Sequence, residues 1–299
     1  MDQSRIAEIL NRHVFEKDKV ALIEAIAKNP DRFVGIFRST TSGLKLLQNL
    51  LQSREIRFGD ALEEIVSALI EDMGFINLDR QSEDGDLVFD QFFRSRDRTQ
   101  YYLVEQKVRD DHDSTKKRGQ IDNFRKKLSY LKSKHGESLT GIMYFIDPSM
   151  HKNERYYQEK INELRNKLKI PIYLFYNGEF FEHFEGHSQT WDLVLSGLQN
   201  WRETIPGQIT LDYDANPEQT LAELRSVSVG VWRKLIANDV LWEGGVITTL
   251  FPNGATLRRL ESSFREQDTS KVKGSAGRYS TKTQQLADLL EQRIMKYYP

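Results

Sequence analysis

A carboxylate and an ammonium lie two positions apart at the end of an apolar run, where packing alone would select neither charge. The run is Tyr101–Lys107, and its charged members are Glu105 and Lys107. If the run forms a strand, both side chains point to the same face, because side chains alternate between the two faces of a strand. A third charge, Asp90, lies fifteen residues before Glu105 in another apolar run, Leu87–Phe93.

The two apolar runs predict a β-hairpin that brings the two carboxylates together. The polar stretch 94–100 connects the runs, and a turn centred near Asp97 or Arg98 would place Asp90 opposite Glu105. Like charges directly opposite each other destabilise a sheet unless a positive charge lies between them. A divalent metal would supply that charge, so we expect a metal site at this end of the hairpin.

The alternative is an exposed edge hairpin in which Glu105 and Lys107 simply face water. Leu103 and Val104 point to opposite faces of the same strand, and both are apolar. Two apolar faces are typical of a strand in the middle of a sheet. This pattern favours the metal site.

The composition excludes several other chemistries. The chain has 299 residues and no cysteine, and therefore no disulfide, thiolate nucleophile or thiolate zinc site. Of the six histidines, only His183 and His187 have the i, i+4 spacing that could share a metal on a helix. Gly186 between them predicts a turn instead. Carboxylates are therefore the expected metal ligands.

Hydrophobic residues make up 38% of the chain and charged residues 29%, as in a soluble globular protein. No apolar run in the sequence reaches the roughly 18 residues that cross a bilayer. Residues 1–5 also lack the basic-then-apolar order of a signal peptide. We expect a cytoplasmic protein without a membrane partner.

The net charge of -1 hides an uneven distribution. Between Ser114 and Gly136 the only acid is Asp122, against eight cations: Lys116, Lys117, Arg118, Arg125, Lys126, Lys127, Lys132 and Lys134. A polyanion could bind to such a segment without the whole protein being basic. The alternative is a solvated helix face.

The N-terminal part is expected to be helical. Apolar residues recur at helical spacing across 5–51, and again across Asp60–Asp72 with Gly74 as the C-terminal stop. After the hairpin, a basic helix is predicted from about Gly119 to Lys134. The elements that follow are a strand at Leu139–Asp147, a helix at Asn153–Leu168 and a strand at Ile170–Tyr176.

This order predicts an α/β fold with a mixed central β-sheet flanked by helices. The last two strands are joined through a helix, so they are expected to run parallel. The expected domains are a helical segment at 1–55, a core at 56–201 and an α-rich C-terminal region at 202–299.

The C-terminal region is interpreted as a part for recognition or dimerisation. We predict a helix at Glu218–Ile236, a short hairpin at Val240–Leu250 turning at Gly244-Gly245, a loop at 268–279 and a final helix at Thr281–Tyr297. Its cations near the loop are Arg258, Arg259, Arg265, Lys271, Lys273 and Arg278. Arginines can read guanine edges in the major groove; ordinary surface charge is the alternative.

Asp90 followed by Glu105-Gln106-Lys107 resembles the PD-(D/E)xK nuclease superfamily. The runs 56–63 and 105–120 are similar to type II restriction endonucleases in particular. The resemblance covers roughly residues 56–180 and implies a restriction-endonuclease-like core. One departure is the extra basic helix between the second and third strands.

The resemblance implies roles for individual residues. Asp90, Glu105 and the main-chain carbonyl of Gln106 would ligate Mg²⁺, a hard cation that prefers oxygen. Lys107 would orient or help deprotonate the attacking water and contact the phosphate. Hydrolysis would leave a 5′-phosphate and a 3′-hydroxyl. Asp86 is the alternative acidic ligand, because it lies on the same strand face as Asp90.

Further site residues come from the flanking elements. Glu63, four residues after Gly59, is either an acidic residue near the metal or a solvated helix flank. Gln120 either supports the metal site or is a plain polar residue at the start of the basic helix. The expected phosphate-binding edge before that helix consists of Ser114, Thr115, Lys116, Lys117 and Arg118.

The expected function is a Mg²⁺-dependent type II restriction endonuclease acting on double-stranded DNA. A homodimer would cut both strands of a symmetric site, and a cognate DNA methyltransferase would protect the host's DNA. The alternatives are a repair or junction-resolving nuclease, and a non-catalytic DNA-binding protein with the same fold.

Overall fold

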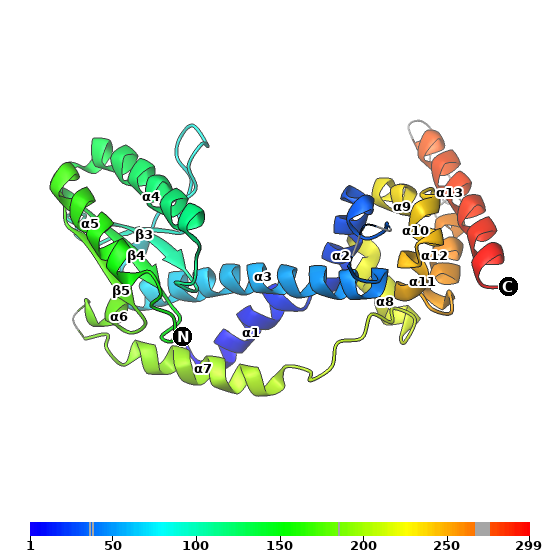
Figure 1. Ribbon diagram of the computed structural model, residues 1–299, viewed down its shortest axis with the longest axis horizontal. Helices are drawn as coiled ribbons and strands as arrows, with labels where there is room; N and C mark the ends of the chain where they lie inside the picture. Colours follow the sequence, from blue (N-terminus) through cyan, green and yellow to red (C-terminus); the bar gives the residue numbers. More distant parts are fainter. Residues whose placement is uncertain (36, 38, 185, 267–275) are drawn as a thin grey trace. The chain divides into compact units, whose positions relative to one another are not determined.

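The computed structural model describes all residues except 36, 38, 185 and 267–275, and for 276–281 only the backbone (Figure 1). The chain divides into two compact units. The first contains Met1–Asn11 and Phe58–Ile205, and the second contains Arg12–Arg57 and Pro206–Pro299. The domain boundaries expected from the sequence stay a prediction.

A mixed five-stranded sheet forms the centre of the first unit and confirms the predicted fold class. The strands lie in the order β1 (Ile76–Asn77), β2 (Gln91–Arg94), β3 (Tyr101–Lys107), β4 (Leu139–Phe145) and β5 (Ile172–Tyr176). β1, β2 and β3 pair antiparallel, whereas β3, β4 and β5 pair parallel, as the helical connections between them require.

Helices cover both faces of this sheet. On one face α4 (Ser114–His135) and α5 (Glu154–Leu168) share an apolar core with β3 and β4, including Phe124, Leu128 and Met143. On the other face Tyr144 of β4 stacks on Phe180 of α6 (Glu179–Glu182). All seven residues of β4 are buried, as expected for a strand covered on both sides.

The first unit also contains helices from the N-terminal part of the chain and from the segment after β5. α1 (Gln3–Val14) contacts α7 (Thr190–Thr204), and the Trp201 indole N–H donates to Asn11 at 2.9 Å. α3 (Ser42–Asp72) contributes its C-terminal half. A short 3-10 helix, Gly136–Ser138, leads into β4.

The hairpin of β2 and β3 has the predicted register. Gln91 pairs with Val104 and Arg94 with Tyr101, so the same register continued by one residue sets Asp90 opposite Glu105. The turn falls where it was predicted, and Arg98 has a φ of +63° there. β2 is shorter than the apolar run Leu87–Phe93, because the chain leaves the ladder before Gln91.

Two helix boundaries differ from prediction. α3 is a single helix of 31 residues, not two, because residues 52–59 contain no proline and one interior glycine costs a helix only about 1 kcal/mol. α4 begins at Ser114, five residues before the expected start. The Asp113 carboxylate caps it by accepting from the backbone N–H groups of Thr115 and Lys116.

The regular secondary structure in the described residues of the second unit is all helical. Its elements are α2 (Asp18–Lys28), the first half of α3, α8 (Pro217–Glu223), α9 (Val229–Ile236), α10 (Asp239–Glu243), α11 (Val246–Leu250), α12 (Ala255–Glu266), α13 (Ala276–Tyr297) and the 3-10 turns Pro30–Arg32 and Leu224–Ser226. They enclose one apolar core around Trp232, Trp242 and Phe251.

The C-terminal elements correct several predictions. The expected hairpin at Val240–Leu250 is wrong, because α10 and α11 occupy it. Asn238 caps α10, and Gly245, with a φ of +73°, separates the two helices. The helix expected at Glu218–Ile236 is interrupted, and the expected loop at 268–279 lies largely outside the described residues.

Among the described helices, none combines the length and apolarity needed to span a bilayer.

Gly141 is required where α4 packs on β4. A Cβ atom there would lie 2.6 Å from Leu128 Cδ2 and 3.3 Å from Phe124 Cζ, two side chains that are fully buried. We expect Gly141→Ala to lower the free energy of unfolding by about 1–3 kcal/mol through overpacking. Gly119→Ala is the control in α4, because a Cβ atom added at Gly119 would have no neighbour within 4 Å. Urea unfolding of both variants tests this, and equal stability of the two would contradict it.

Candidate active site

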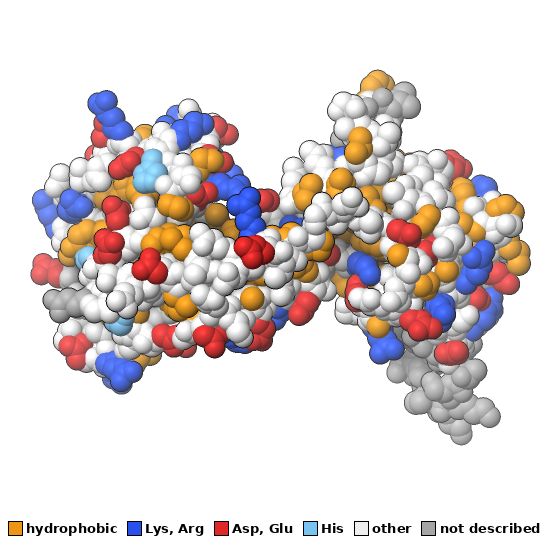
Figure 2. All heavy atoms as spheres, turned by 90° about the horizontal axis from the view of Figure 1, so that it is seen from below, with side chains coloured by type: hydrophobic (Ala, Val, Ile, Leu, Met, Phe, Trp, Pro, Cys, Tyr) orange, Lys and Arg blue, Asp and Glu red, His pale blue; other side chains and the backbone are white. Residues whose placement is uncertain are grey.

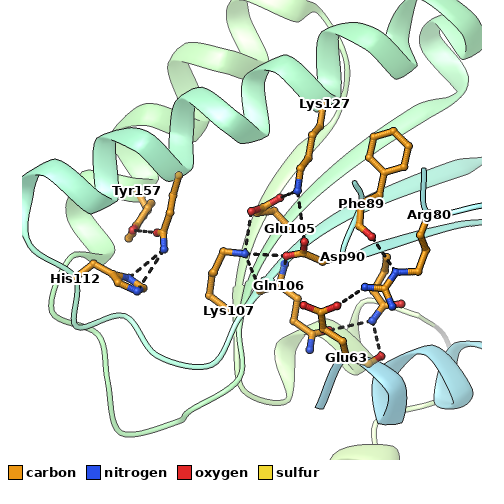
Figure 3. Close-up of polar contacts among 12 residues, drawn as sticks. Glu63, Arg80, Phe89, Asp90, Glu105, Gln106, Lys107, His112, Lys127 and Tyr157 are labelled. Atoms are coloured by element: carbon orange, nitrogen blue, oxygen red, sulfur yellow. Dashed lines mark hydrogen bonds and ion pairs between the residues drawn. The ribbon is translucent and has the colours of Figure 1, made fainter. Parts of the chain in front are cut away.

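One lysine ammonium joins the three oxygen donors predicted from the sequence (Figure 3). Lys107 Nζ lies 2.8 Å from Asp90 Oδ2, 2.8 Å from Glu105 Oε1 and 2.8 Å from the main-chain oxygen of Gln106. The hairpin register causes this arrangement, because it places Asp90, one residue before β2, level with Glu105 on β3. The three oxygens therefore surround a single cationic position.

A second lysine, from α4, closes the cluster into a ring of alternating charge. Lys127 Nζ donates to Glu105 Oε2 and lies 3.4 Å from Asp90 Oδ1. Each carboxylate thus uses one oxygen for Lys107 and the other for Lys127 (Figure 3). With two carboxylates and two ammonium groups, the ring has no net charge.

Exposure distinguishes the two sides of the ring. The side chains of Glu105 and Lys127 are 3% and 5% exposed, those of Asp90 and Lys107 13% and 24%. Lys107 is therefore on the open side and Lys127 on the closed side. Asp90 is fixed further by the backbone N–H of Gln106, which donates to its Oδ2 at 2.8 Å.

The pKa shifts agree with this arrangement. Burial alone would lower the pKa of the Lys107 ammonium, but the charges of Glu105 and Asp90 outweigh burial and raise this pKa above its ordinary value. Burial likewise opposes ionisation of Asp90, yet Lys107 and Lys127 hold its pKa below the ordinary value. Both groups are therefore charged at neutral pH.

Glu63 in α3 lies beside this ring. Its carboxylate pairs with Arg80, whose Nε donates to the carbonyl of Phe89 at 2.9 Å. Burial, followed by the charge of Asp90, raises the pKa of Glu63, and Arg80 only partly offsets them. Gln91 ties the helix to the strands, because its amide donates to the main-chain oxygen of Glu63 at 2.7 Å and to Gln106 Oε1 at 3.3 Å.

The structure does not bring Asp86 to the cluster. Asp86 is exposed in the loop before β2, where its backbone N–H donates to Asp84 Oδ1 at 3.2 Å. Asp90, in contrast, contacts Lys107 directly. Of the two acidic residues weighed from the sequence, only Asp90 shares a cation with Glu105 in the described part of the chain.

The expected phosphate-binding edge before the basic helix is in fact its first turn. Ser114–Lys117 are helical, and the Asp113 carboxylate already occupies two of the N–H groups expected to be free for phosphate. Lys117 donates to Asn153 Oδ1 at 2.9 Å, and Arg118 donates through Nε to the carbonyl of Ser114 at 3.0 Å. The backbone N–H groups capped by Asp113 are therefore not free to bind phosphate. The side chains of Thr115, Lys116 and Arg118 are exposed and could still contact it.

The hydrogen bonds of Gln120 join it to residues outside the charge ring. Its side-chain oxygen accepts from the Tyr157 hydroxyl at 2.6 Å, and its amide nitrogen lies 3.3 Å from the ring nitrogens of His112. Burial, followed by the charge of Lys116, lowers the pKa of His112. Gln120 thus links α4 to α5 and to the loop after β3.

The sequence patterns do not single out Lys127 as a site residue and include it only among the cations of the basic helix. It lies on the apolar stripe of α4, three residues after Phe124 and four before Leu131, and only 4% of it is exposed. A lysine within an apolar helical stripe is the signal that could have identified it, because lysine is almost never fully buried without a partner.

The oxygen donors of the ring fit a hard divalent cation. Lys107 Nζ shows that Asp90, Glu105 and the Gln106 carbonyl can reach one common cation. Within the described residues no group of three Asp, Glu or His side chains is placed to hold a metal ion. Any metal here would therefore depend on the main-chain oxygen in addition to the two carboxylates.

The protein has an α/β fold, and the charge ring beside its hairpin is a candidate cation-binding centre. A family model described as "Type II restriction endonuclease, HinfI" matches residues 2–88 and 75–202. These matches cover more than half of the chain, so it belongs to the HinfI family of type II restriction endonucleases. No curated protein matches the chain significantly. The matched residues include the whole ring, whereas 203–299 lie outside the match.

Proposed function

We propose that this chain is a Mg²⁺-dependent type II restriction endonuclease with a PD-(D/E)xK active site. It would hydrolyse phosphodiester bonds of double-stranded DNA at a specific site and leave 5′-phosphate and 3′-hydroxyl ends. The observation that carries this proposal is the convergence of Asp90, Glu105 and the Gln106 carbonyl on one cationic position, within a chain of this family.

Asp90, Glu105 and the carbonyl of Gln106 would hold the metal. Mg²⁺ bound to them would offset negative charge on the scissile phosphate and make a bound water a better nucleophile. The protein's own contribution is to keep the metal ligands ionised: Lys107 and Lys127 hold the pKa of Asp90 low. The two carboxylates can stay ionised before a metal binds, because the lysine ammonium groups already compensate their negative charge.

Lys107 would orient the attacking water and contact a phosphate oxygen. It is the more exposed of the two lysines, and its raised pKa keeps it a hydrogen-bond donor. Glu63 is assigned a supporting catalytic role. The negative charge of Asp90 contributes to the raised pKa of Glu63, whereas the pKa of Asp90 is lowered. Glu63 therefore takes up a proton more readily than Asp90 does.

DNA would contact the start of α4 through side chains. Lys116 and Arg118 are exposed there, next to Ser114, Thr115, Lys117 and Gln120. The face drawn in Figure 2 mixes acidic and basic side chains. In the sequence of α4, by contrast, basic residues far outnumber acidic ones. Phosphate contacts of this kind make the affinity fall steeply with salt.

A restriction enzyme implies partners. Cleavage of both strands at a symmetric site is simplest for a homodimer, and a cognate DNA methyltransferase would protect the host's DNA in the same cytoplasmic compartment.

The C-terminal region 202–299 is assigned to DNA recognition or dimerisation. Among its cations, Arg265 pairs with Glu261, Asp288 and Glu291, and Arg259 pairs with Glu218 at 3.1 Å; Lys271 and Lys273 lie outside the described residues.

Digestion of a mapped DNA tests the function directly. With Mg²⁺ we expect discrete fragments whose sequenced ends carry 5′-phosphates. With a chelator we expect no fragments, because the chelator removes the cation that would offset the charge of the scissile phosphate. Nicking that depends on DNA structure rather than on sequence would instead favour a repair or junction-resolving nuclease. DNA binding without any product at all Mg²⁺ concentrations would favour a non-catalytic DNA-binding protein.

A further inference from the structure

Lys127 is the one member of the charge ring that the proposed function does not place in contact with the metal, the attacking water or the DNA. It approaches from α4 on the side opposite the open end, where its side chain is 5% exposed. Phe124 and Leu128 beside it pack fully buried against the sheet, so the position of its ammonium is set by the helix. This ammonium contacts Glu105 Oε2 and leaves Oε1 to the position that Lys107 occupies.

The two lysines differ in how easily they can give way to a metal. Lys107 touches the three oxygens of the proposed metal site and is 24% exposed, so it can turn toward solvent or a phosphate. Among its described contacts with the two carboxylates, Lys127 meets Asp90 Oδ1 and Glu105 Oε2, the oxygens that Lys107 does not contact. Its side chain is only 5% exposed, so it has no path to solvent like that of Lys107. A cation entering the ring would therefore take the place of Lys107, with Lys127 still beside it.

We propose that Lys127 is a positioning residue that anchors Glu105 through Oε2 and, as a fixed positive charge, weakens the site's hold on the metal. This inference rests on the proposed metal-binding function. The ring is neutral with both lysines, so a divalent cation meets a site with one negative charge after Lys107 has turned away. Without Lys127 the same site would carry two negative charges and an unanchored Glu105.

Calorimetric titration of the DNA-free protein with MnCl₂ tests the inference apart from catalysis. We expect Lys127→Met to bind Mn²⁺ with a dissociation constant about tenfold lower than the wild type, because one charge at this range outweighs thermal energy even at a high effective dielectric constant. Cleavage of DNA with saturating Mg²⁺ should nevertheless be slower, because Glu105 has lost its anchor. General damage to the fold would weaken both binding and cleavage.

Matched variants complete the experiment. Lys126→Met removes a neighbouring but exposed charge of the same helix and should leave the Mn²⁺ affinity within about twofold of the wild type, because exposed charges are screened. Lys127→Arg keeps the charge and should bind Mn²⁺ like the wild type. If Lys127→Met fails to fold, Lys127→Gln removes the same charge while it can still donate to Glu105, and the same comparison applies.

The outcomes separate this inference from the proposed function. If Lys127→Met binds Mn²⁺ no more tightly than the wild type, while Glu105→Gln abolishes binding, the role of Lys127 is overturned and the metal site stands. If Lys127→Arg binds as tightly as Lys127→Met, the charge is not the cause and the inference also fails. If the wild type binds no Mn²⁺, with or without DNA, the proposed metal site itself is wrong.

Discussion

Lys107→Ala is expected to lower the rate of DNA cleavage by about a hundredfold to a thousandfold, as loss of a hydrogen-bond donor that stabilises a transition state does, while DNA binding is retained. The ammonium of Lys107 lies on the open side of the ring and contacts all three proposed metal ligands. Its removal takes away the cation that would contact the phosphate and orient the water. The basic helix, which would supply the contacts for binding, is unchanged.

Single-turnover cleavage and a binding assay in the absence of Mg²⁺ measure the two quantities separately. Lys160→Ala is the control, because this partly exposed lysine of α5 forms its ion pair with Glu163 and makes no contact with the ring among the residues described. We expect the control to cleave at the wild-type rate. Wild-type cleavage by Lys107→Ala would remove Lys107 from the mechanism, and parallel loss of binding and cleavage would assign it to DNA contact.

The hairpin could be predicted because its determinants are local. Alternation of apolar side chains sets which residues share a face, and the turn length sets which residues pair. Both are visible in a stretch of about twenty residues. The opposition of Asp90 and Glu105 followed from these two properties. Their common contact with Lys107 is a finding of the structure, because the sequence predicts a divalent cation between the two carboxylates.

Lys127 could not be placed in the same way, because its contacts depend on how α4 packs across the sheet. Its two carboxylate partners are distant in sequence: Glu105 is 22 positions before it and Asp90 is 37. The close packing that sets this geometry depends on Gly141 in β4, which admits Leu128 of α4. The apolar stripe of α4 can mark Lys127 as a buried lysine, but one sequence does not show which carboxylates lie beside it.

The wrong hairpin at Val240–Leu250 has a similar cause. Val246, Ile247, Thr248 and Thr249 favour strands by intrinsic preference, and Gly244-Gly245 is typical of a tight turn. In the folded unit Val246, Ile247 and Leu250 are buried together in the apolar core, and their i, i+1, i+4 spacing places them on one helical face. Burial in the core outweighs local preference here.

Glu105→Gln is expected to abolish cleavage and also to destabilise the first unit. The substitution keeps the shape of the side chain but removes the charge that lies between Lys107 and Lys127. Lys127 then remains buried, with Asp90 at 3.4 Å as its only carboxylate among the described contacts. Breaking a buried ion pair in this way costs on the order of 3 kcal/mol.

A double variant separates the two effects of this substitution. In Glu105→Gln with Lys127→Met the buried ammonium is removed together with its partner, so we expect the free energy of unfolding to return to within about 1 kcal/mol of the wild type. Cleavage should stay absent, because Glu105 is a proposed metal ligand. Urea unfolding and the cleavage assay on both single variants and the double variant complete the cycle. Additive losses of stability would show that Glu105 and Lys127 do not interact, and any cleavage by the double variant would exclude Glu105 as an essential ligand.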